Sequence, residues 1–184
     1  TGPGGDAGPP TRAAGFQVPK PALPAWLLSV ELIRKNTLFL RPDPGRAAAS
    51  PRATTADIPF AELRTRLDAM LAATREAGAL PVVATLARAF HPDQPQAQQQ
   101  RLSTSMRYYH DCFDVPALNA NVDAFNRMLR DAAAAWDAPL VELARAIPPG
   151  GAHFADATHF SIKGEAVAAR AVTAVLRESL DRLN

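Results

Sequence analysis

Two chemistry-bearing residues, Asp156 and His159, stand three positions apart in one short segment of the 184-residue chain. In a turn, this spacing lets a carboxylate accept the imidazole Nδ1 hydrogen, which fixes the tautomer and leaves Nε2 free as a general base. The carboxylate also stabilises the imidazolium that forms when the base removes a proton from a hydroxyl. The pair therefore indicates hydrolytic chemistry of the Ser-His-Asp kind.

Two other interpretations of these residues compete with the first. In one, Asp156 caps the turn and His159 is an ordinary surface side chain. We expect Ser161 to be the better N-cap of the helix that follows, which frees the carboxylate for another role. In the other, His153, Asp156 and His159 supply the residue types of a two-histidine, one-carboxylate metal site. No further cluster of ligands accompanies them, so we expect no metal there.

A second group of candidate residues, Tyr108, Tyr109 and His110, lies in a long loop expected after an apolar run. We predict either that these side chains line a substrate pocket or that they pack within the loop. Cys112 stands close to His110, but neighbours in sequence seldom have the geometry of a nucleophile and its base, so we expect an ordinary thiol. His91 follows the same apolar run, and we expect no direct catalytic role for it.

The elements that position these residues follow from hydrophobic periodicity. Apolar positions recur at three- and four-residue steps in 26–40, 60–78, 122–136 and about 163–183, which predicts four amphipathic helices. Short apolar runs at 80–86 and 140–143 have the character of strands buried on both faces. This alternation predicts a parallel sheet covered by helices, with ligands bound at the carboxyl ends of the strands. The segments that leave those ends, 87–118 and 144–160, hold the candidate residues.

The remaining sequence limits the classes of protein that fit. Residues 1–24 are rich in proline and glycine and are expected to form a loop or linker, and 41–57 a long exposed connection. Residues 25–184 are expected to form one α/β domain. A net charge of +2 with scattered basic residues argues against a nucleic-acid partner, and no apolar run is long enough for a membrane span. The single cysteine excludes an internal disulfide and leaves the compartment open.

The segment Phe154-Ala-Asp-Ala-Thr-His-Phe-Ser-Ile-Lys-Gly164, followed by an alanine-rich helix, resembles the last conserved block of the SGNH/GDSL hydrolases. The similarity covers roughly 60–183 and includes the stretch 121–143. It implies a flavodoxin-like three-layer α/β/α fold with a parallel sheet. It also implies hydrolysis of a small-molecule or carbohydrate ester through an acyl-enzyme, without a metal or organic cofactor. In that mechanism Asp156 orients the imidazole, and His159 is the base.

The sequence departs from this family in the blocks that carry the nucleophile and the oxyanion hole. Gly5-Asp6-Ala7 echoes the expected Gly-Asp-Ser block but lacks the serine and a preceding strand. Asn36 lies in a predicted helix without the expected glycine, so it is not assigned to the oxyanion hole. We therefore expect the C-terminal portion of such a domain, incomplete at its N-terminus and inactive alone. The alternative is a non-catalytic α/β binding or assembly module.

Overall fold

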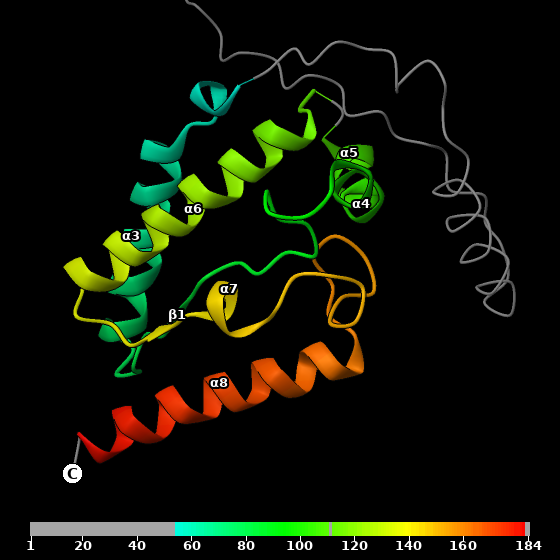
Figure 1. Ribbon diagram of the computed structural model, residues 1–184. Helices are drawn as coiled ribbons and strands as arrows, with labels where there is room; N and C mark the ends of the chain where they lie inside the picture. Colours follow the sequence, from blue (N-terminus) through cyan, green and yellow to red (C-terminus); the bar gives the residue numbers. More distant parts are fainter. Residues whose placement is uncertain (1–53, 111, 183–184) are drawn as a thin grey trace, which may run out of the picture. The chain divides into compact units, whose positions relative to one another are not determined.

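The structure is a computed structural model that describes residues 54–110 and 112–182 (Figure 1). The linker expected at 1–24, the helix expected at 26–40 and most of the connection expected at 41–57 lie outside these ranges. The described elements, in chain order, are η2 (Thr55–Asp57), α3 (Phe60–Glu76), β1 (Val83–Ala84), α4 (Gln96–Leu102), α5 (Thr104–Tyr109), α6 (Val115–Ala135), β2 (Leu140–Val141), α7 (Leu143–Ala146) and α8 (Ile162–Asp181).

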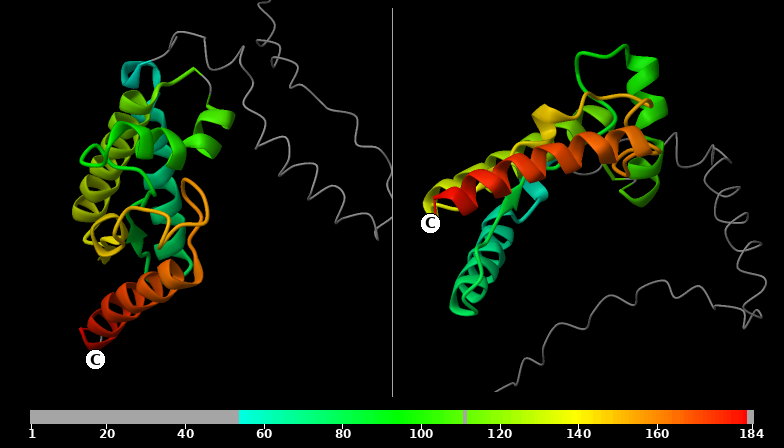
Figure 2. Two further views of the ribbon diagram at one scale, coloured as in Figure 1. Left: turned by 45° about the vertical axis from the view of Figure 1, so that its right-hand side comes forward. Right: turned by 90° about the horizontal axis from the view of Figure 1, so that it is seen from below.

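The two strands pair in parallel, as the alternation of helices and apolar runs predicts. Val83 lies opposite Leu140, and Ala84 lies opposite Val141. The predicted runs are correctly placed but too long, because only two residues of each form a strand. Helix α6 contacts β1, and α8 contacts β2. Figures 1 and 2 show the strands between these two helices. The described part of the chain is therefore mostly helical, with one small parallel sheet.

One hydrophobic cluster joins α3, β1 and α6. Its buried members are Leu71, Val83, Leu129, Ala132, Ala133 and Ala138. Helix α6 supplies three of these six residues, Leu129, Ala132 and Ala133. Burying one face in this way is what stabilises an amphipathic helix. A polar contact adds to this packing: Trp136 donates its indole hydrogen to Asp68 Oδ1 at 2.7 Å.

The ends of α3 and α6 show how local sequence sets the helix lengths. Gly78 takes a left-handed conformation with φ 74° just after α3, which confirms it as the predicted stop. Asp114 begins α6, because its carboxylate accepts the Ala117 N–H at 2.7 Å. The Pro116 ring lies in the first turn of α6, where a missing N–H costs nothing.

The segment between the strand β1 and α6 is not the long loop that the sequence predicts. Residues 96–102 and 104–109 form α4 and α5, so the glutamine-rich run lies partly in a helix and Tyr108 and Tyr109 end another. Gln99 stabilises the start of α4 by donating its side-chain amide to the Gln94 carbonyl at 2.7 Å. Leu102 packs against the buried residues that follow β1. Contacts of this kind stabilise α4 and α5, although neither helix has an apolar stripe.

The end of α6 generates a stability prediction. Asp137 follows α6 with φ 45°, a left-handed conformation that costs a residue with a Cβ about 1–2 kcal/mol. The Ala138 N–H nevertheless bonds the Ala133 carbonyl at 2.9 Å, which closes the helix in the manner that glycine favours. We expect Asp137→Gly to raise the free energy of unfolding by about 0.5–1 kcal/mol in urea denaturation.

The matched control is an aspartate-to-glycine substitution within α6 itself. Asp131 is exposed on α6, so Asp131→Gly should lower the free energy of unfolding by about 1 kcal/mol. Equal effects of the two substitutions would contradict the left-handed assignment of Asp137.

Candidate functional site

The Asp156 and His159 residues lie in a short loop that the backbone closes on itself. Phe154 and Phe160 form an isolated antiparallel bridge, and their ring centroids are 5.4 Å apart. Inside this bridge the Ala155 N–H donates to the His159 carbonyl at 2.8 Å. The five residues between the phenylalanines therefore have little freedom to change shape.

This loop, residues 154–160, is attached to the chain that leaves β1. The Ala89 N–H donates to the Ala157 carbonyl at 2.9 Å, and the Ala157 N–H donates to Ser105 Oγ on α5 at 3.1 Å. Phe154 and Ala157 are buried in neighbouring hydrophobic clusters. The parallel pairing of β1 and β2 brings these segments together at the carboxyl end of the sheet.

Within the loop, the Asp156 carboxylate has two different hydrogen-bonding roles. Its Oδ1 accepts the backbone N–H groups of Thr158 and His159, each at 2.9 Å. Its Oδ2 lies 2.7 Å from His159 Nδ1. An ionised carboxylate only accepts, so Nδ1 carries a hydrogen, and in the neutral imidazole Nε2 then presents a lone pair. The contact that the Asp-x-x-His spacing predicts is present, and the capping interpretation holds alongside it.

These contacts also keep the Asp156 carboxyl ionised. Its partial burial by itself raises the pKa, because removing water disfavours the charged form. The backbone N–H groups of His159 and Thr158 and the His159 ring act in the opposite direction and together hold the pKa below its ordinary value. A carboxylate that stays charged is what an orienting partner for imidazole requires.

His159 itself projects outward, with 81% of its side chain exposed. Among residues 54–110 and 112–182, Asp156 is the only hydrogen-bond partner of its ring. In those ranges no serine, threonine or cysteine reaches Nε2.

No group of three His, Cys, Asp or Glu side chains in the described part of the chain has the geometry of a metal site. No helix in these residues has both the length and the apolar character of a membrane span.

Helix α8 begins directly after the loop. The Gly164 N–H donates to Ser161 Oγ at 3.2 Å, which confirms Ser161 as the predicted N-cap. The Ser161 hydroxyl in turn donates to the Ala152 carbonyl at 2.8 Å. A Cβ at position 164 would stand 2.0 Å from the His153 carbonyl oxygen, so only glycine fits this close approach.

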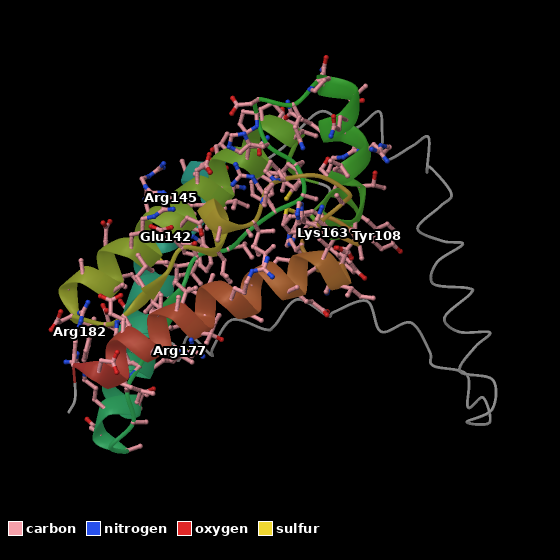
Figure 3. All side chains as sticks on the ribbon, turned by 60° about the horizontal axis from the view of Figure 1, so that its bottom comes forward. Tyr108, Glu142, Arg145, Lys163, Arg177 and Arg182 are labelled. Atoms are coloured by element: carbon pink, nitrogen blue, oxygen red, sulfur yellow. The ribbon has the colours of Figure 1, made fainter. Side chains whose placement is uncertain are left out.

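The other predicted site residues lie at or just after the end of α5, the helix whose Ser105 contacts the loop 154–160. Tyr108 and Tyr109 form an edge-to-face pair at the end of α5, with ring centroids 5.3 Å apart, and both are exposed, as is His110. Figure 3 shows Tyr108 at the same end of the molecule as Lys163 in the first turn of α8. Cys112 is half-buried. Tyr108, Tyr109, His110 and Cys112 do not line the pocket at the carboxyl end of the two strands.

A pocket of about 340 Å³ opens at the carboxyl end of the two strands. Its walls come from the segments that follow β1 and β2 and from one face of α6. The lining residues are Leu86, Arg88, His91, Asp123, Asn126, Arg127, Arg130, Ala144, Arg145, Ile147 and Pro149. The sequence predicted a site at this edge of the sheet but none of these residues as part of it; His91, for which we expected no direct catalytic role, is one of the lining residues.

A sequence signal for the pocket does exist. Arg88 stands two residues after the apolar run 80–86, and a charged residue is unusual in a segment that continues a buried strand. Asp123, Arg127 and Arg130 recur at three- and four-residue steps, which marks one polar stripe on α6. Asp123 and Arg130 of this stripe are half-buried and Arg127 is exposed, because the segment 86–91 covers part of the stripe.

Comparisons with protein-family models, with curated proteins and with solved structures found no match to this chain. The function is therefore inferred from the side chains that the structure brings together. Of these, the Asp156 and His159 pair has the best-defined chemical capacity, that of a base with an oriented imidazole.

The contact at Gly164 predicts a stability effect that would reach the site. Gly164→Ala must displace either α8 or the His153 carbonyl, because the two atoms nearest to the new Cβ, the carbonyl oxygen and carbon of His153, belong to the backbone. We expect the free energy of unfolding to fall by about 2 kcal/mol or more. In Gly151→Ala, where the nearest atom is 4.0 Å away, the change should stay within about 0.5 kcal/mol. Equal losses in urea denaturation would contradict the close approach.

The hydrogen bonds of Asp156 predict a titration that NMR can measure. The Asp156 carboxyl should titrate below its ordinary pKa in the folded protein. In His159→Ala the Asp156 pKa should move upward, because the hydrogen bond from the imidazole ring is lost. Since the folded pKa lies below the unfolded one, this carboxylate stabilises the fold above the unfolded pKa, and that contribution is lost as the pH falls through the folded pKa. An Asp156 pKa unaffected by His159→Ala would contradict the 2.7 Å contact.

Proposed function

We propose that Asp156 and His159 are the orienting carboxylate and the general base of an ester hydrolase of the SGNH/GDSL type. The observation that carries the proposal is the 2.7 Å contact between Asp156 Oδ2 and His159 Nδ1. It is supported by the two backbone N–H groups that hold Oδ1, because they fix the carboxylate independently of the ring. The imidazole is thereby oriented before any substrate binds, which is the arrangement that base catalysis favours.

In the proposed mechanism His159 Nε2 takes the proton of a nucleophilic serine as its oxygen attacks the ester carbonyl carbon. Asp156 stabilises the imidazolium, which then gives the proton to the departing alcohol and leaves an acyl-enzyme. Water attacks this intermediate in the same way and releases the acid. The serine belongs to residues outside the described ranges, and the exposure of His159 is compatible with its approach.

The proposal includes a flavodoxin-like α/β/α domain around the pair. Parallel pairing of β1 and β2, with α6 in contact with one strand and α8 with the other, supports it. The loop 154–160 follows β2 and α7 and meets the segment that follows β1, so the pair belongs to the carboxyl end of the sheet. Ligands of open α/β folds bind at that end. The proposed substrate is a carboxylic ester of a small molecule or a carbohydrate.

The test is hydrolysis of p-nitrophenyl acetate by the full-length gene product and by two glutamine variants. His159→Gln removes the base and should lower kcat/KM by about a thousandfold. His153→Gln is the matched control, because this histidine is six residues away and makes no side-chain hydrogen bond in the described part of the chain; its activity should stay near that of the parent. Circular dichroism checks that both variants fold.

A fluorophosphonate probe that reacts only with an activated serine identifies the nucleophile by mass spectrometry. We expect the parent to be labelled and His159→Gln to resist labelling. Equal hydrolysis by His159→Gln and His153→Gln would refute the proposed role of the pair. A folded parent that neither hydrolyses the ester nor reacts with the probe would instead favour the non-catalytic binding or assembly module.

A further inference from the structure

The pocket at the carboxyl end of the strands is separate from the proposed base. None of its lining residues belongs to the loop 154–160, and it is built from three other segments. Leu86 lies two residues after β1, Arg145 lies in α7, which follows β2, and Arg127 lies in α6. A concave site of this volume is within the range that small-molecule sites occupy.

The charges in the pocket wall do not cancel. Four arginines, Arg88, Arg127, Arg130 and Arg145, line it. Two acidic partners face them: Asp123 pairs with Arg88 at 2.8 Å, and Glu142 accepts two hydrogen bonds from Arg130 at 2.8 and 2.9 Å. Four positive charges against two negative charges leave an excess of two.

That excess resides on Arg127 and Arg145. Arg127 is exposed and makes no hydrogen bond or ion pair within the described ranges. Arg145 approaches Glu142 only to 3.8 Å, with 75% of its side chain exposed, and Glu142 is already bound to Arg130. Figure 3 shows the Arg145 and Glu142 side chains next to each other after β2. Both guanidinium groups therefore have donors free for a ligand.

Arg88 supplies a fixed positive charge in the same wall. Only 7% of its side chain is exposed. Its Nε donates to the Phe90 carbonyl and to Asn119 Oδ1 at 3.0 and 2.9 Å, and its Nη1 pairs with Asp123. Its Nη2 is buried and has no acceptor in the described part of the chain. A buried cationic donor without a partner is costly and is uncommon in folded proteins unless a function requires it.

We propose that this pocket is a binding site for an oxyanion, namely a phosphate or carboxylate group of a small molecule. Arg127 and Arg145 bind its oxygens directly, since guanidinium groups pair with both oxyanions through two parallel hydrogen bonds. Arg88, in the same wall, adds a positive charge that its hydrogen bonds hold in place. The site does not depend on the proposed ester hydrolysis, because none of its residues takes part in that chemistry.

The experiment is an NMR titration of the folded protein with inorganic phosphate and, separately, with acetate. Sodium chloride keeps the ionic strength constant, because salt screens nonspecific attraction. We expect saturable shifts of the backbone amides of 86–91 and 144–145 with at least one of the two anions in the millimolar range. The anion that binds more tightly distinguishes a phosphate from a carboxylate ligand.

Two double variants test the assignment to side chains. Arg127→Gln with Arg145→Gln removes the free donors and should raise Kd about tenfold or more. Arg170→Gln with Arg177→Gln removes the same charge from exposed positions of α8, outside the pocket, and should leave Kd within about twofold. Figure 3 shows Arg177 on that helix. Saturable binding by neither anion, or equal loss of affinity in both double variants, would overturn the proposal.

Discussion

The structure depends on how the buried segment 85–90 satisfies its backbone polar groups. It runs beyond the two paired residues of β1, and five of its six residues are buried. The Thr85 N–H still donates to the Val141 carbonyl of β2 at 3.0 Å. Beyond it, side chains and loops take the place of a strand: the Asn126 side-chain amide accepts the Leu86 N–H at 2.7 Å and donates to the Leu86 carbonyl at 3.0 Å. Ala89 N–H donates to the Ala157 carbonyl. An unpaired buried group costs about 1–3 kcal/mol, so these contacts fix α6 and the loop 154–160 against the segment.

The segment 85–90 also contacts both the loop of the proposed base and the proposed anion pocket. Successive residues of an extended chain point to opposite sides. Arg88 extends its side chain to Asn119 and Asp123 on α6, where the pocket lies. Ala89, the next residue, pairs through its backbone with the loop that carries His159. A displacement of this segment would therefore disturb both places, although they share no side chain.

The sequence predicted the elements whose signals are local. Helices α3, α6 and α8 were found because each has an apolar stripe, and Gly78 and Ser161 mark an end and a start by their own chemistry. The strands were predicted too long because an apolar run reports burial, and burial in 85–90 does not require strand pairing. Helices α4 and α5 were missed because they carry no apolar stripe, and contacts such as that of Leu102 with the core stabilise them.

The difference between local signals and contacts made by the fold also separates the Asp156 and His159 pair from the arginine-lined pocket. The Asp156 and His159 pair was predictable because four consecutive residues of one turn contain it, whereas the pocket joins side chains 88, 127 and 145, which only the fold brings together. Sequence also posed capping and orienting as alternatives for Asp156. They coexist because a carboxylate has two oxygens: Oδ1 holds the turn and Oδ2 holds the ring. The backbone contacts fix the position of the carboxylate, so the orientation of His159 follows from the local fold and needs no contact with a nucleophile.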